Sequence, residues 1–372
     1  MNLDLIPGLD PHGLPGPPWL FQSLLVLTFL LHMLFVNLTL GGSLLAAVSH
    51  IAAGGREDDH RLLLARRLAS VNTFAIALAI TTAIAPLLFI QVLYQQYFYT
   101  ATILLGWIWF SLLVLLVLGY YAAYLYKLRG APVRGQGGGG WLVLAAVAFL
   151  LIACLQVAVY LIQAQPGQWT RFAEAPLAVL SDPTFWPRLV HFVFAALAFT
   201  AVVMTWWAVR RARAGDDVEG NGRVAAYAWR WALWTTALVL ADGFILLALL
   251  PRPVLISMMR GGAATLVPLT VAILLAVGLV MMLARGSDPV QSPGLVSGVA
   301  ATAVLVIAVM SIVRDQVRVL YLQPATSHFT WQTAPQWFNT ALFALLLIAG
   351  LATIAYVVRR VLAAPASGPD AA

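Results

Sequence analysis

The 372-residue chain has few charged residues and only one cysteine. Charged side chains make up 9% of it and hydrophobic ones 62%, whereas soluble domains are about a quarter charged. The single cysteine, Cys154, excludes an internal disulfide. The chain has no Cys-x-x-Cys-His motif, which excludes a covalently attached c-type haem. This composition excludes an ordinary soluble protein.

Three further features are missing. No Asp or Glu occurs between Asp59 and Glu174. We find no convincing internal repeat, and such repeats are typical of many secondary transporters. The opening residues have neither a basic segment nor a cleavage-type site before the first apolar run, so we expect no removed signal peptide.

Long apolar runs dominate the chain. A run of about 20 residues crosses the ~30 Å hydrocarbon core as a helix. We count nine such runs, at 19–52, 68–94, 101–126, 141–163, 185–209, 227–250, 264–284, 293–313 and 338–360. The sequence therefore predicts an all-α, polytopic membrane helix bundle: a single transmembrane domain at 1–362 and a disordered tail at 363–372.

The distribution of Lys and Arg predicts the orientation. Of the 21 Lys and Arg residues, one set of connections holds only Arg171, Arg188, Arg252, Arg260, Arg314 and Arg318. The remaining fifteen mark the cytoplasmic side. We therefore expect the N-terminus outside and the C-terminus in the cytoplasm of a bacterial-type inner membrane, in contact with lipid. The net charge of +7 then reflects topology, and no nucleic-acid partner is expected.

Two histidines lie within apolar runs. His32, in FLLHMLFVNLTLGG, lies about 20 Å below Trp19 at 1.5 Å per residue. His191, in FWPRLVHFVFAALAF, begins the fifth run. Ionisable residues within a membrane are costly and mark functional sites, and neutral imidazole is a common metal ligand. Both are candidate ligands of a metal or haem iron, or members of a proton route.

Methionine is a normal axial partner of histidine at haem. Met259 and Met258 stand in the predicted outer loop before the seventh run, at the level of His191. We take Met259 as the candidate ligand and Met258 as its alternative. Both also suit plain apolar packing.

Charged residues gather near the same outer face. Arg188 precedes His191 by three residues, and Asp315 and Arg318 share a helix face beside Arg314. Guanidinium groups here would suit haem propionates, which they bind through paired hydrogen bonds. Interfacial positioning with local ion pairs is the competing interpretation. Asp242 interrupts the sixth run as a further ionisable group in the membrane.

These placements resemble subunit I of the cytochrome bd quinol oxidases. His32–Gly41, HMLFVNLTLG, is similar to that family's HFLFVPLTLG on its first helix. The surroundings of Asn72, the Arg188-Leu-Val-His191 pattern and Asp242 are weaker matches on the second, fifth and sixth helices. The nine-helix layout with an outer N-terminus is similar too.

The resemblance implies roles for individual residues. His32 matches the histidine that ligates the oxygen-reactive haem. His191 matches a ligand of low-spin haem b, whose methionine partner matches Met259. Asp315 and Arg318 match a Glu-x-x-Arg pattern that supplies a carboxylate ligand to the third haem.

The sequence also departs from the family. Trp109 and Val117 fall where the third helix of the family carries two glutamates, and the long quinol-binding loop is reduced to a dozen residues around Pro251. Oxygen reduction needs a proton for each electron, so we expect no oxygen reduction.

The leading hypothesis is a haem b-containing electron-transfer subunit. It would act between a membrane donor, with quinol as one candidate, and an outer-face acceptor such as a c-type cytochrome. A second membrane subunit is expected beside it. The rival is a proton- or metal-translocating transporter subunit that uses His32, Asp242 and His191.

Overall fold

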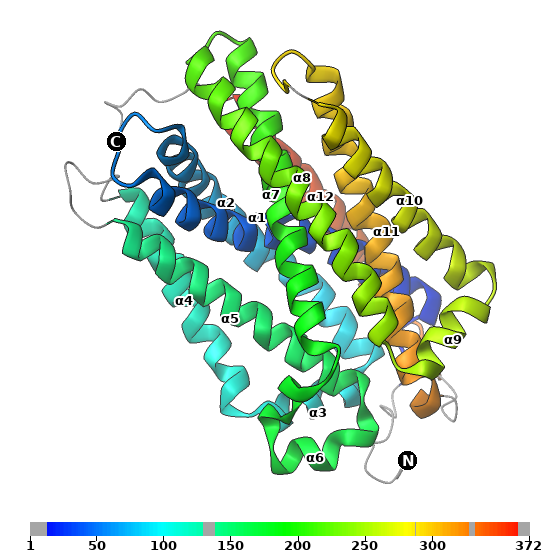
Figure 1. Cartoon of the computed structure of the whole chain (residues 1–372). Coiled ribbons are helices and arrows are strands. Elements are labelled where there is room, and N and C mark those ends of the chain that lie inside the picture. The colour runs from blue at the N-terminus through cyan, green and yellow to red at the C-terminus, as the bar shows by residue number, and fades with distance from the viewer. Residues whose placement is uncertain (1–12, 129–137, 287, 327–331, 364–372) are drawn as a thin grey trace.

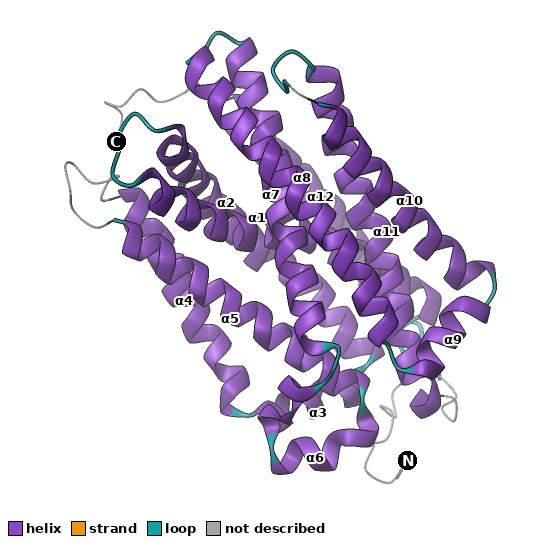
Figure 2. Ribbon diagram, in the orientation of Figure 1, coloured by secondary structure: helices purple, strands orange, loops and turns teal. Residues whose placement is uncertain are grey.

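The chain forms a bundle of long helices (Figures 1 and 2). The computed structural model describes residues 13–128, 138–286, 288–326 and 332–363. Within these residues every extended regular element is helical, and nine helices are long and apolar enough to cross a membrane. The predicted polytopic all-α fold is confirmed.

The spanning helices are α1 (Pro18–Ala53), α2 (His60–Leu93), α4 (Trp107–Leu128), α5 (Gly139–Ala164), α7 (Phe185–Arg213), α8 (Val218–Leu249), α10 (Ala263–Arg285), α11 (Pro293–Thr326) and α12 (Trp337–Ala363). The connections contain α3 (Gln95–Leu105), α6 (Trp169–Glu174), α9 (Arg252–Arg260) and the 3-10 turns η2 (Pro166–Gln168) and η3 (Pro176–Ser181). Figure 1 shows α3, α6 and α9 at the end of the bundle where α1 begins, opposite the end where α1 finishes. This is the end predicted to face outward.

Local chemistry explains where the helices depart from the predicted runs. The side chain of Asp59 accepts a hydrogen bond from the backbone N–H of Arg61 at 2.8 Å, so α2 begins at His60, eight residues before the apolar run. Gly106, with φ of 52°, separates α3 from α4. The helix α11 continues to Thr326 and carries its charged residues inside the bundle. Of the predicted tail, residues 364–372 lie outside the described part of the chain.

The central helix is α1, which packs against α2, α5, α7 and α11. A Cβ atom on Gly41 would lie 2.1 Å from the carbonyl oxygen of Ala196 on α7. The amide of Asn72 on α2 donates to the carbonyl of Thr39 at 3.1 Å and to the hydroxyl of Ser43 at 2.8 Å. Small residues let membrane helices approach closely, and polar groups then join them. The LTLGGS segment after His32 is therefore the contact surface of α1.

The last helix, α12, is packed least. In the 18-residue apolar stretch of α12 that could cross a membrane, no residue is buried within the described chain. In the corresponding stretch of α7, 61% of the residues are buried. Its connection is held by backbone hydrogen bonds at 2.8 Å, from Leu14 N–H to Gln332 and from Ala334 N–H to Leu14. Nearly the whole lateral surface of α12 is therefore open.

Candidate functional site

His32 on α1 presents one ring nitrogen to the neighbouring helix. Its Nδ1 lies 3.0 Å from the carbonyl oxygen of Ala79 and 3.5 Å from the hydroxyl of Thr82, both on α2. A backbone carbonyl can only accept, so the neutral ring donates through Nδ1–H and keeps its lone pair on Nε2. Metal-binding histidines are oriented in this way by an acceptor behind the ring. Part of the His32 side chain stays accessible although α1 is central.

His191 on α7 has a comparable arrangement. Its Nδ1 lies 3.3 Å from Oδ2 of Asp242 on α8, and the two side chains are 25% and 11% exposed. The two atoms are in contact but are not aligned for a hydrogen bond. Gly243 leaves room for the ring, because a Cβ atom there would lie 3.3 Å from His191 Cε1. Asp242 is thus not an isolated carboxylate in the membrane but the neighbour of a histidine.

Six side chains form an arginine–tyrosine cluster near the outer ends of the helices: Arg188, Arg314, Arg318, Tyr94, Tyr160 and Tyr321. The ring of Tyr160 on α5 contacts both Arg188 and Arg314, with each guanidinium carbon 4.9 Å from the ring centroid. Arg314 also lies 4.2 Å from the ring centroid of Phe29 on α1. The cluster therefore contacts α1, the helix that carries His32.

Asp315 and Arg318 form the i, i+3 pair expected from the sequence. Arg318 Nη1 donates to Asp315 Oδ1 at 3.1 Å, and the arginine is 2% exposed. The amide of Gln22 on α1 donates to the other oxygen, Oδ2. Both carboxylate oxygens already accept hydrogen bonds, so this geometry favours a role for Asp315 in orienting Arg318.

The cluster has more positive than negative charge. Within the described residues no carboxylate forms an ion pair with Arg188 or Arg314. The Nε groups of Arg188 and Arg318 are buried without a hydrogen-bond acceptor. Buried charge is costly unless it is paired and hydrogen-bonded. These donors fit an anionic group such as a carboxylate pair.

The two methionines lie in a short helix, α9, where the sequence predicted a loop. Pro251 precedes α9 and Pro is compatible with a helix start, which explains the difference. Met258 is 1% exposed among apolar residues of α10 and α11, whereas Met259 is 40% exposed. The buried thioether of Met258 is therefore better protected from solvent than that of Met259.

The described chain contains no group of three or more His, Cys, Asp or Glu side chains that could hold a metal ion. On α4, Trp109 packs against Phe98 with ring centroids 6.3 Å apart, and Val117 is 53% exposed.

Sequence reasoning missed the groups that hold the predicted residues in place. Gln22, Tyr94, Tyr160 and Tyr321 were not singled out, and Ala79 contributes only its backbone carbonyl. A tyrosine near a helix end is typical of an interfacial aromatic belt. No sequence pattern distinguishes it from one that stacks on a buried guanidinium.

No protein-family model matches the sequence, and no curated protein sequence does. A solved structure does match: the bd oxidase from Geobacillus thermodenitrificans, with a TM-score of 0.74 over 94% of this chain and 98% of that one. The chain has a bd oxidase fold. The sequence identity is 14%, so the match confirms the predicted resemblance at the level of the fold.

Proposed function

We propose that this multi-pass membrane protein is a haem b-containing electron-transfer subunit. One observation carries the proposal: two histidines within the membrane, His32 and His191, each have Nδ1 against an acceptor on the next helix. This leaves Nε2 of each ring available to iron. Such a partner fixes the tautomer and the orientation of the ring, as the acceptors behind metal-binding histidines do.

The side chains fit haem, the group that the bd oxidase resemblance implies. His32 and His191 would hold the haem iron. The Nε donors of Arg188 and Arg318, which lack an acceptor, and the guanidinium of Arg314 would bind propionates. Bound haem would supply a one-electron carrier. Asp242 and the Ala79 carbonyl would hold the imidazoles in position.

Met258 and Met259 remain the candidate partners of His191. The burial of Met258 supports it as the thioether that is shielded from water, whereas the Met259 side chain is 40% exposed. Thioether ligation raises a haem potential relative to two histidines. Such a site would favour the reduced state.

The position of the cluster supports electron transfer near the outer face. The donor would be a membrane reductant, with quinol as one candidate, and the acceptor an outer-face protein such as a c-type cytochrome. Oxygen reduction is not part of the proposal, because α4 offers Trp109 and Val117 but no acid to deliver protons.

A second membrane subunit is part of the proposal. The open surface of α12 supports it, since no other part of the described chain buries the apolar stretch of that helix. The orientation inferred from Lys and Arg, together with this fold, supports a bacterial cytoplasmic membrane as the location.

A second function, a proton- or metal-translocating subunit, is favoured by the contact between His191 and Asp242. Both groups exchange protons and both lie in the membrane. In that case His32 and His191 would carry no iron, and the two hypotheses differ in the visible spectrum.

The test is the visible spectrum of the full chain, expressed with ample haem and purified in detergent, before and after reduction. We expect a haem b band in the wild type. His191→Ala should abolish or shift the low-spin signal, and His32→Ala should lower the haem content. His50→Ala is the control, because His50 lies at the other end of α1 with Nδ1 3.1 Å from the hydroxyl of Tyr126. A haem-free wild type would refute the proposal and favour translocation. Unchanged spectra in both variants would refute the ligand assignment.

A further inference from the structure

A groove of about 400 Å³ runs along α8 away from the arginine–tyrosine cluster. It is lined by Phe194 of α7 and, on α8, by Tyr227, Arg230, Trp231, Trp234, Thr235 and Leu238. Its wall is almost entirely apolar, and Arg230 is the one charged residue in the lining. Trp234 is 68% exposed, so the groove opens on the lateral surface of the bundle.

The position of Arg230 along α8 places the groove relative to the bilayer. Arg230 precedes Leu249, at the opposite end of the helix, by 19 residues, which is about 29 Å at 1.5 Å per residue. That length matches the ~30 Å hydrocarbon thickness. Arg230 therefore lies at the headgroup level of the predicted cytoplasmic leaflet, and Trp231, Trp234 and Leu238 lie below it in hydrocarbon.

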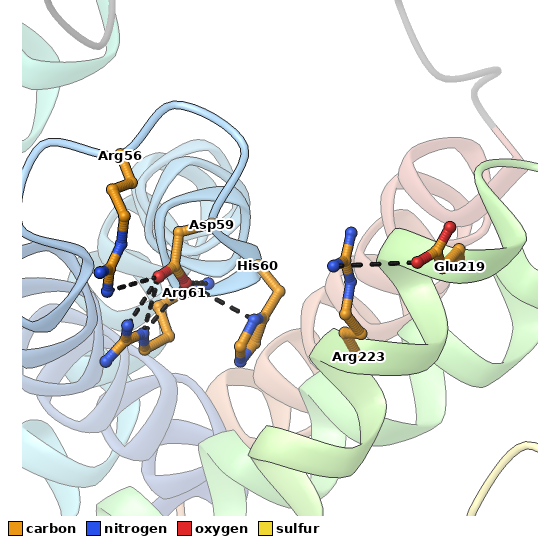
Figure 3. A network of polar contacts seen from close by, with 6 residues as sticks. All are labelled: Arg56, Asp59, His60, Arg61, Glu219 and Arg223. Carbon is orange, nitrogen blue, oxygen red and sulfur yellow. Dashed lines mark hydrogen bonds and ion pairs between the residues drawn. The ribbon is translucent and has the colours of Figure 1, made fainter.

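The charge of Arg230 is available to a ligand. Within the described chain no carboxylate forms an ion pair with it, and none lines the groove. Two acids before α2 and on the first turn of α8 have other partners, as Figure 3 shows: Asp59 lies 2.6 Å from Arg61, and Glu219 lies 3.8 Å from Arg223.

Aromatic side chains on both sides of Arg230 along α8 complete an amphipathic site. Tyr227 contacts Trp231, with ring centroids 6.4 Å apart, and also the ring of His60 on α2, at 5.6 Å. The polar tips of Tyr and Trp suit the interface, and their rings suit acyl chains. A cation above an aromatic groove matches a molecule with an anionic head and an apolar tail.

We propose that this groove binds an anionic phospholipid of the cytoplasmic leaflet. Its phosphate pairs with Arg230, and one acyl chain lies along Trp231, Trp234 and Leu238. Basic pockets between membrane helices on this side bind anionic headgroups. A phosphatidylcholine headgroup carries its own cation and gains less from Arg230, so the site discriminates by headgroup charge.

The experiment is native mass spectrometry of the delipidated full chain, titrated with phosphatidylglycerol or with phosphatidylcholine of the same acyl chains. Arg230→Gln should weaken phosphatidylglycerol binding about fivefold, as expected for one basic residue near an anionic surface. Trp234→Ala should weaken both lipids. Arg285→Gln and Trp107→Ala are matched controls, because both residues are exposed and neither lines the groove.

Selective binding of phosphatidylglycerol by the wild type, lost in Arg230→Gln but kept in Arg285→Gln, would support the proposal. Equal binding of the two lipids by the wild type would overturn it, and this measurement needs no variant to fold. Equal losses in the two arginine variants would overturn it as well. Displacement of the lipid by soluble glycerol phosphate would assign the site to free phosphate. A co-purifying quinone that is lost in Trp234→Ala would assign the groove to quinone instead.

Discussion

The close approach of α1 and α7 makes Gly41 sensitive to substitution. The new Cβ atom in Gly41→Ala would lie 2.1 Å from the carbonyl oxygen of Ala196, 2.4 Å from its carbonyl carbon and 2.6 Å from Thr200 Oγ1. Two of these atoms belong to the backbone, so rotation of a side chain cannot relieve the clash. The two helices that carry His32 and His191 would have to separate.

The size of the effect follows from this geometry. Ordinary contact begins at 3.4 Å, so α7 must move by about 1.3 Å, which resembles an overpacked core and costs about 1–3 kcal/mol. The shift would also strain the hydrogen bond from Thr200 to the Asn37 carbonyl at 3.0 Å, worth about 1 kcal/mol. By contrast, a Gly→Ala change that meets no steric clash stabilises a helix by about 1 kcal/mol.

The matched control is Gly278→Ala on α10, where an added Cβ atom meets nothing within 4 Å. Unfolding in mixed micelles with increasing sodium dodecyl sulfate measures the free energy of unfolding of both variants. We expect Gly41→Ala to be less stable than Gly278→Ala by about 2–4 kcal/mol, roughly 30- to 700-fold in the unfolding equilibrium. Equal stabilities would show that α1 and α7 are not in the close contact described.

The remaining predictions concern the α2 cap, the methionines and oxygen. The hydrogen bond from the Arg61 side chain holds the pKa of Asp59 well below its usual range. The resulting stability is present above the unfolded value of about 3.9 and is lost as the pH falls below it. Asp59→Asn should therefore destabilise by up to about 1 kcal/mol at pH 7, and the difference from the wild type should shrink at pH 3; a constant difference in melting experiments would contradict this. Met258→His should keep low-spin haem and lower its midpoint potential in a redox titration, with Met259→His as the parallel variant; if neither potential moves, the ligand lies elsewhere. The purified chain should consume negligible oxygen with a reduced quinol or dye in an oxygen electrode, and sustained consumption that His32→Ala abolishes would refute this.

Much of the candidate site could be expected from the sequence. His32 and His191 could be singled out because few ionisable residues interrupt the long apolar runs. An ionisable side chain in a membrane span is energetically costly, so it can be recognised from the sequence alone. Asp315 and Arg318 could be paired because helix periodicity alone puts i and i+3 on one face. The His32–Gly41 motif suggested the bd oxidase fold, which the structural match confirms.

Other parts of the site could not be expected. The partner of His191 is Asp242, 51 positions later, and the acceptor for His32 is a backbone carbonyl with no sequence signal. The order of burial of Met258 and Met259 depends on how α9 rotates against α10 and α11. Tyr160 lies between two arginines only because α5, α7 and α11 converge at one level.

The nine apolar spans follow from the sequence by itself, which also predicts their orientation from Lys and Arg and the depth of each polar residue. These depend on hydrophobicity, charge and the fixed rise of a helix, which are local or additive properties. Only the tertiary structure decided which nitrogen of His32 and of His191 is engaged, which arginines have no carboxylate partner among the described residues, and where a groove opens beside Arg230. Those features depend on the rotation and separation of helices from distant parts of the chain. Steric contacts such as that of Gly41 with Ala196 set the separation of the helices. Each such contact involves two distant segments, so neither segment alone predicts it.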